Sequence, residues 1–285
     1  MQLTCLIFPR LKRSSRAMLL PAILALCTAA GSAYAQDEPP ADQPDAEAIL
    51  LGMADYLSKA QSFSVDVHDS YDTYQESGQK IEYSESRTII VVRPDRLRID
   101  VLESDGEEQS IIYDGKQIMV SNPLANVYGA SPAPGTTDEA VVYFVQKLHM
   151  RMPFAPLLLT TAPAELQKRT TTLDYVEETS IHGAKAHHLA GRTAAVDYQV
   201  WIEDGDRPLL QRLVLTYPNE PGEPQFRAQF SNWNLAPQSS DTMFATTPPP
   251  GATRIAFLAE LPSSVAPSQE IPAPAGDTDA DGGQK

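Results

Sequence analysis

The sequence FSVDVHDSY at residues 63–71 decides the fold, because apolar and polar side chains alternate along it. Alternation with a period of two is typical of a β-strand that turns one face to a core and the other to water. The pattern runs to a turn at residues 76–78. We expect further strands near residues 79–92, 96–103, 107–114 and 117–122, with Asp114-Gly115 as a hairpin turn. The first half of the chain is therefore predicted to form an antiparallel meander.

Helices are predicted both before and after this meander in the sequence. Asp45 is a suitable N-cap, and apolar residues recur on one helical face from Ile49 to Leu57. A second amphipathic helix is expected over residues 138–150, and the apolar run at 153–159 is compatible with a further short helix. Together these elements form a helical insertion at residues 138–165.

Strand patterns resume after the insertion. We expect strands near residues 171–180, 184–190, 196–204, 208–217 and 224–234, separated by turn residues. About ten or eleven strands with one leading helix and one helical insertion define an α+β domain built on a single large antiparallel sheet. So long an open sheet tends to curl, and its apolar face must be covered. The helices are the predicted cover.

The two ends of the chain are predicted to lie outside this domain. Residues 1–35 combine a basic start, an apolar stretch and the cleavage site Ala33-Tyr34-Ala35, which predicts a secretory signal peptide cleaved after Ala35. Residues 36–45 are predicted to be a flexible linker, and residues 258–285 a disordered acidic tail rich in Pro and Ala. The domain is thus expected to span residues 46–257 and to be exported.

Both cysteines, Cys5 and Cys27, fall in the predicted signal peptide. The mature protein would then have no disulfide and no thiol nucleophile. The sequence Leu24-Ala25-Leu26-Cys27 loosely resembles the lipobox of a bacterial lipoprotein, but the bulky Leu26 stands where that signal has a small residue. We therefore expect ordinary cleavage and no lipid on Cys27.

Charge excludes one class of partner. The 285 residues include 22 Lys and Arg against 37 Asp and Glu, a formal net charge of -15. Nucleic acids are bound by clustered basic side chains, and no such cluster occurs beyond the first sixteen residues. The apolar stretch at residues 18–30 is too short to span a bilayer comfortably. We expect neither a nucleic-acid partner nor an integral membrane protein.

Signatures of catalysis are scarce. The sequence has no G-x-S-x-G elbow, P-loop, H-E-x-x-H or Gly-rich dinucleotide turn, so we predict no catalytic residue and no cofactor. His187 and His188 are neighbours on a predicted strand and should point to opposite faces. His182 and His188 could share a face, but a third ligand cannot be identified, so we predict no metal site.

The acidic residues also have simple structural interpretations. Residues 203–206, with the sequence EDGD, lack the spaced acids of an EF-hand loop and predict a turn. Asp66 and Glu82 would suit glycosidase chemistry only if they faced each other across a cleft. A solvated polar face of the sheet is the favoured interpretation.

Four motifs follow one another along the chain: RPDRLRI at 93–99, YDGK at 113–116, DTMF at 241–244 and PPGA at 249–252. In this order they resemble the LolA-like superfamily of periplasmic lipoprotein carriers. Within that superfamily the chain more closely resembles a family of predicted periplasmic proteins of unassigned function, for which WIEDGDRP at 201–208 is also typical. The resemblance covers about residues 46–257.

The resemblance implies an unclosed half-barrel whose concave, apolar face is lidded by helices and accepts acyl chains. From pattern alone a filled core is favoured, because a cavity lining and a core have the same composition. The residues that would line such a cavity are Phe63, Leu97, Ile99, Tyr113, Phe144, Leu148, Phe154, Tyr198, Ile202, Leu213 and Phe230. Phe144 and Leu148 are expected at its mouth, beside Tyr113 and Tyr198.

The expected function is a non-catalytic periplasmic carrier for the acyl chain of a lipid or lipoprotein. Each buried methylene contributes about 0.8 kcal/mol, so a dry hollow binds an acyl chain without catalytic groups. An envelope membrane protein would be the acceptor of the cargo. The alternative is an envelope-stress sensor or protein-interaction module on the same scaffold.

The signal-peptide prediction can be tested on the exported protein. We expect its N-terminus to be Gln36, because the A-x-A site precedes that residue and Leu26 disfavours lipidation. Mass spectrometry of the intact mature protein gives the answer. A mass that corresponds to an acylated Cys27 would show that the prediction is wrong.

Overall fold

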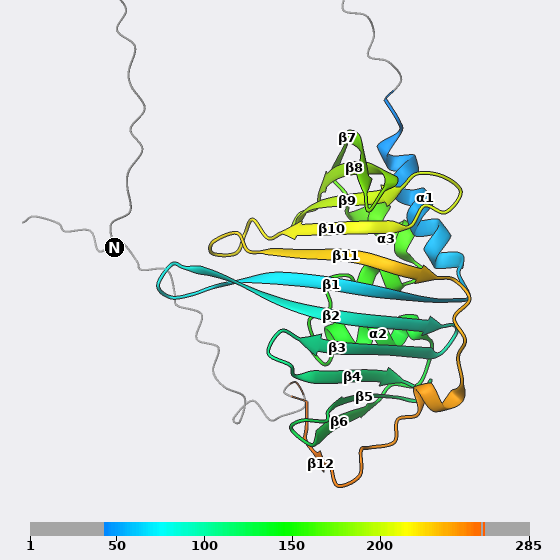
Figure 1. Cartoon of the computed structure of the whole chain (residues 1–285), viewed down its shortest axis with the longest axis vertical. Helices are drawn as coiled ribbons and strands as arrows, with labels where there is room; N and C mark the ends of the chain where they lie inside the picture. Colours follow the sequence, from blue (N-terminus) through cyan, green and yellow to red (C-terminus); the bar gives the residue numbers. More distant parts are fainter. Residues whose placement is uncertain (1–42, 258, 260–285) are drawn as a thin grey trace, which may run out of the picture. The chain divides into compact units, whose positions relative to one another are not determined.

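A single twelve-stranded sheet forms the frame of the protein (Figure 1). The computed structural model describes residues 43–257 and 259. The predicted signal peptide, residues 36–42 of the predicted linker and the predicted tail, apart from residue 259, lie outside the described residues. The predicted domain boundaries therefore stay predictions.

The sheet consists of two antiparallel meanders. The first comprises β1 (Ser62–Tyr74), β2 (Lys80–Val92), β3 (Arg96–Glu103), β4 (Glu108–Tyr113), β5 (Gln117–Asn122) and β6 (Val127–Pro132). The second comprises β7 (Thr172–Ile181), β8 (Ala184–Arg192), β9 (Asp197–Glu203), β10 (Leu210–Thr216) and β11 (Gln225–Asn234). The short β12 (Thr253–Arg254) pairs in parallel with β6.

Strand β1 joins the two meanders into one sheet. The spatial order is β12-β6-β5-β4-β3-β2-β1-β11-β10-β9-β8-β7. Val67 of β1 lies opposite Arg87 of β2 on one side and Phe230 of β11 on the other. The strand predicted first from its alternation is therefore the central strand of the sheet.

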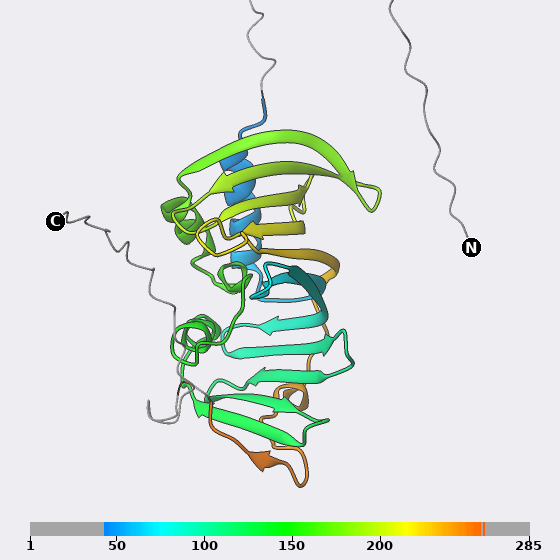
Figure 2. The ribbon, with the colours of Figure 1, turned by 90° about the vertical axis from the view of Figure 1, so that its left-hand side faces the viewer.

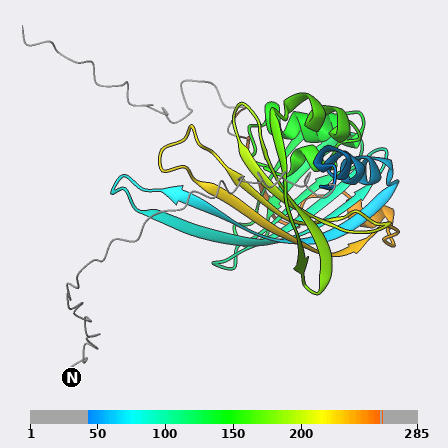
Figure 3. The same ribbon diagram turned by 90° about the horizontal axis from the view of Figure 1, so that it is seen from above.

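The helices cover one face of the curved sheet, which we call the inner face (Figures 2 and 3). They are α1 (Ala46–Lys59), α2 (Thr137–Gln146), the 3-10 helix η1 (Ala155–Leu158) and α3 (Ala162–Arg169). Inner-face residues such as Phe63 and Val65 belong to the main apolar core, while Ser64 and Asp66 lie on the outer face. The alternation in β1 thus sets which face of the sheet is buried.

Capping interactions determine where the two longest helices, α1 and α2, begin. Asp45 caps α1, and its carboxylate accepts a hydrogen bond from the Ala48 amide at 3.1 Å. Thr136 and Glu139 form a capping box at the start of α2. The predicted start of the first helix is confirmed, and the predicted α+β fold with a single curled antiparallel sheet is confirmed as well.

Three details differ from the expectation. The sheet has twelve strands, and β6 was missed because Gly129 and Pro132 weaken its strand pattern. Helix α2 ends at Gln146, although the apolar pattern was expected to continue to residue 150. The insertion extends past residue 165, since α3 occupies Ala162–Arg169. This helix buries only Ala162, so it shows no apolar periodicity in sequence.

The C-terminal segment contacts both faces of the sheet. The 3-10 helix η2 (Asp241–Phe244) buries Phe244 against Ile112 and Met119 on the outer face. Beyond β12, Phe257 joins the main core of the inner face and is 7% exposed. Gly129 permits this contact, because a Cβ there would lie 3.1 Å from the ring of Phe257.

The role of this contact can be tested by truncating one side chain. Phe257→Ala is expected to lower the free energy of unfolding by about 2–4 kcal/mol, because it leaves a cavity in a packed core. Ile255→Ala is the matched control, since Ile255 is 49% exposed. Urea denaturation of the two variants gives the comparison. Equal effects would mean that Phe257 does not anchor the segment.

Candidate functional site

An apolar pocket lies between the helices and the second meander. Its volume is about 250 Å³. The walls are supplied by α1, by the segment around η1, by α3, by the β8–β9 connection and by strands β9 and β10. The principal apolar lining residues are Leu50, Met53, Phe154, Leu157, Leu166, Tyr198, Val200, Leu213 and Leu215. Such a lining can hold a hydrocarbon group and offers little to a polar one.

A polar groove of about 540 Å³ adjoins this pocket. Pro153 and Tyr217 line both hollows, so the apolar pocket and the groove are neighbours. The groove lies over β1 to β4 and is bounded by the β10–β11 connection and by residues 150–153. Side chains that line it include Tyr71, Tyr74, Glu85, Arg87, Glu103, Gln109, Arg151 and Glu220. An apolar hollow and a charged hollow therefore lie side by side.

A buried ionic cluster stands at the inner side of the groove. Asp69 is 1% exposed, and the Nε atom of Arg87 donates a hydrogen bond to its carboxylate at 2.8 Å. Glu85 also forms an ion pair with Arg87. Burial raises the pKa of Asp69 and the pKa of Glu85 and outweighs the opposing effect of Arg87. The charge of Asp69 raises the pKa of Glu85 further.

Arg87 also connects the sheet to the helical cover. Its guanidinium carbon lies 5.6 Å from the centroid of the Phe154 ring. The same ring packs against Phe226 of β11, with centroids 6.5 Å apart. Phe154 immediately precedes η1, so the charged cluster and the cover of the apolar pocket are in direct contact.

The structure buries all of the residues predicted to line a cavity. Phe63, Leu97, Ile99, Tyr113, Phe144, Leu148, Phe154, Tyr198, Ile202, Leu213 and Phe230 all belong to the main core, with exposures of 7% or less. Phe154, Tyr198 and Leu213 line the apolar pocket, and Phe144 lines the groove. The others are brought into the same core but line neither hollow. Their role in ligand binding stays a prediction.

The expected mouth beside α2 differs from what is observed. Phe144 and Tyr113 surround a void of only about 10 Å³, barely the space of one water molecule. Leu148 is 3% exposed. Tyr113 on β4 and Tyr198 on β9 belong to different meanders. The cause is close packing of α2 onto β3 to β5 around this void. The larger hollows are the groove over β1 to β4 and the apolar pocket under α1, η1 and α3.

Sequence reasoning missed the charged groove. A signal was present, because Asp69 continues the inward positions of Phe63, Val65 and Val67 in the alternation of β1. Glu85 and Arg87 likewise occupy positions opposite inward residues of β1. Charged residues at core positions of a strand point to a special environment.

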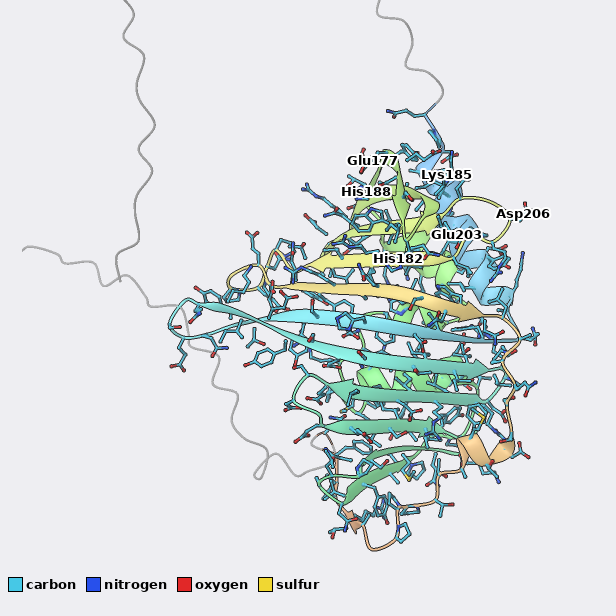
Figure 4. All side chains as sticks on the ribbon, in the orientation of Figure 1. Glu177, His182, Lys185, His188, Glu203 and Asp206 are labelled. Atoms are coloured by element: carbon cyan, nitrogen blue, oxygen red, sulfur yellow. The ribbon has the colours of Figure 1, made fainter. Side chains whose placement is uncertain are left out.

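His187 and His188 each contact side chains of neighbouring strands or turns. The Nε2 atom of His187 lies 3.1 Å from Asp204, and that of His188 lies 3.0 Å from the Gln199 side chain. His188 stacks on Trp201, with ring centroids 4.1 Å apart. Figure 4 shows the labelled His182 and His188 side chains apart from each other. Among the described residues, no group of three or more His, Cys, Asp or Glu could hold a metal ion.

The acidic candidates are also explained by local contacts. Asp66 accepts hydrogen bonds from Thr88 and Asn232, both at 2.9 Å. In the pairing of β1 with β2, Glu82 lies opposite Asp72, whereas Asp66 lies opposite Thr88. Asp66 and Glu82 are therefore far apart along the strands and face no common cleft. Residues 203–206 lead out of β9 into the connection to β10.

Comparison with known proteins gives a family and a set of similar folds. The model of a family described as "Predicted periplasmic protein (DUF2092)" matches residues 46–258. No protein of curated function matches the sequence. Within residues 43–257 and 259, no helix has the length and apolar character needed to cross a membrane.

The similar solved structures are distant in sequence. Lipoprotein LppX from Mycobacterium tuberculosis is 14% identical, with a TM-score of 0.43 over 69% of this chain and 98% of that one. A Pseudomonas aeruginosa MucA/MucB complex gives 18% identity and a TM-score of 0.39 over 70% and 61% of the chains. A LolA superfamily protein from Nitrosomonas europaea gives 12% identity and a TM-score of 0.35 over 70% and 97%.

The ionic cluster predicts a pH dependence of stability. The pKa of Asp69 is raised above its ordinary value of 3.8. The folded protein therefore binds this proton more tightly than the unfolded chain does. The contribution of Asp69 to the free energy of unfolding should therefore fall as the pH rises from 3.8 through the pKa of the folded state.

Asp69→Asn removes this titration. The stability of the parent protein relative to Asp69→Asn is expected to decrease as the pH rises through that range, measured by urea unfolding at each pH. Asp206→Asn, in the exposed β9–β10 connection, is the matched control. A stability difference that stays constant with pH would contradict the raised pKa.

Proposed function

The chain belongs to the DUF2092 family of predicted periplasmic proteins, and from this premise we propose that it is a non-catalytic carrier of a lipid or lipoprotein acyl chain. The acyl chain of the cargo occupies the apolar pocket beneath α1, η1 and α3. The head of the cargo lies in the polar groove. The apolar pocket with a charged groove beside it is the observation that carries this proposal.

The chemistry of the pocket supports hydrocarbon binding. Its inner walls are Leu, Met, Val and aromatic side chains from the helices and two strands. Each methylene transferred from water to such walls contributes about 0.8 kcal/mol. The volume of about 250 Å³ lies just below the usual range for small-ligand sites, so the pocket takes part of a long chain.

The segment around η1, which covers the apolar pocket, is held in place by a few specific contacts. The Arg93 side chain donates a hydrogen bond to the Leu158 carbonyl at 3.0 Å, and the Thr160 amide donates one to Asp138 at 2.8 Å. Together with the contact between Arg87 and Phe154, these attach both ends of η1 to the sheet and to α2. Cargo enters when this segment lifts, and the contacts re-form over the bound chain.

A second candidate function is an envelope-stress sensor or protein-interaction module. The observation that favours it is the edge of the sheet at β7, which pairs only with β8 among the described strands. An edge strand can add a strand of a partner protein. Asp174, Glu177 and Glu178 along β7 would favour a basic partner segment.

Filling the pocket tests the carrier proposal. We expect the parent protein to bind the neutral fluorescent probe N-phenyl-1-naphthylamine, and Leu213→Trp to raise its Kd about tenfold or more because the indole occupies the pocket. Leu102→Trp on β3 is the control, since Leu102 is 48% exposed and does not line the pocket. Fluorescence titration measures the Kd, and a thermal melt checks that both variants are folded.

Two outcomes would contradict the carrier proposal. One is a parent protein that does not bind the probe. The other is a folded Leu213→Trp variant that binds it as tightly as the parent does.

A further inference from the structure

The groove beside the apolar pocket is the nearest charged surroundings for the head group of a cargo. Pro153 and Tyr217 line both the apolar pocket and the groove. An amphiphile with its chain in the pocket can therefore place its head between β1 to β4 and the β10–β11 connection. The inference that follows rests on the proposed function.

Carboxylates outnumber guanidinium groups in the lining of the groove. The charged side chains that line it are Asp72, Glu85, Glu103, Glu220, Arg87 and Arg151. Arg87 is already engaged by Asp69 and Glu85. Arg227, which does not line the groove, forms an ion pair with Asp72 at 3.0 Å. An anionic head would therefore have to rely mainly on Arg151, an exposed residue at the rim.

Glu103 adds negative charge on the β3 side of the groove. Its carboxylate accepts a hydrogen bond from the side chain of Gln109 at 2.9 Å. Because that amide is neutral, the bond does not compensate the charge of Glu103. Glu220 adds a further carboxylate from the β10–β11 connection on the opposite side.

Tyrosine rings lie among these carboxylates. Tyr71, Tyr74 and Tyr217 line the groove, and Tyr71 stacks on Tyr83 with ring centroids 5.8 Å apart. The pKa of Tyr71 is raised by burial and then by the charges of Glu85 and Glu103, which outweigh the effect of Arg151. The carboxylates of Glu85 and Glu103 are therefore the main negative charges that act on this ring.

Aromatic faces beside carboxylates are the usual surroundings of a bound ammonium group. From this juxtaposition of Tyr71, Glu85 and Glu103 with the apolar pocket, we propose that the hollow selects amphiphiles with a cationic ammonium head over those with an anionic head. The cation lies against the tyrosine faces, and the carboxylates compensate its charge.

The test compares two head groups on one chain length. The purified protein is loaded with N-phenyl-1-naphthylamine at low ionic strength, and dodecyltrimethylammonium or dodecanoate displaces the probe below its micelle concentration. We expect the ammonium compound to displace the probe at a roughly fivefold lower concentration or less. The double variant Glu103→Gln/Glu220→Gln is expected to lose most of this preference while it still binds the probe.

A matched variant controls for net charge. Glu82→Gln/Glu108→Gln removes the same charge from exposed residues that do not line the groove, and it is expected to keep the preference. Equal or tighter binding of dodecanoate would overturn the head-group inference and leave the carrier proposal intact. Equal loss of the preference in both double variants would likewise overturn the head-group inference and leave the carrier proposal intact. Failure of the parent protein to bind the probe would overturn both.

Discussion

The structure depends on keeping the inner face of a long, curved sheet away from water. Apolar side chains from both meanders point to this face, and the sheet cannot cover it by closing on itself. The chain therefore covers it with α1, α2, η1 and α3. The cover is uneven. Helix α2 packs closely onto β3 to β5, whereas hollows remain over β1 to β4 at the groove and between the other helices and β9 and β10.

The cluster of Asp69, Glu85 and Arg87 is the main exception to this apolar face. Buried ion pairs give little net stability, because desolvation offsets most of their attraction. Three ionisable groups at inward positions of β1 and β2 are thus better explained by what lies beside them. Glu85 and Arg87 line the groove, and Arg87 contacts Phe154 at the cover of the apolar pocket.

The fold could be predicted from sequence because its signals are local. The alternation from Phe63 to Tyr71 and the cap at Asp45 each specify an element within a few residues. Helix α3 and strand β6 lacked such signals. The site could not be predicted in the same way, because Leu97 in the filled core and Leu213 in the pocket are the same residue type at similar strand positions. The packing of distant helices separates the two roles.

The position of β1 at the centre of the sheet affects the order of folding. This strand is made early, yet one of its two partners is β11, with Ser64 opposite Asn234. A chain that emerges N-terminus first can pair β1 with β2 at once, but the other edge of β1 must wait until most of the domain has emerged. Contacts so distant in sequence form slowly. Newly emerged molecules therefore expose a long unpaired strand edge, at which strands of other chains can pair in place of β11.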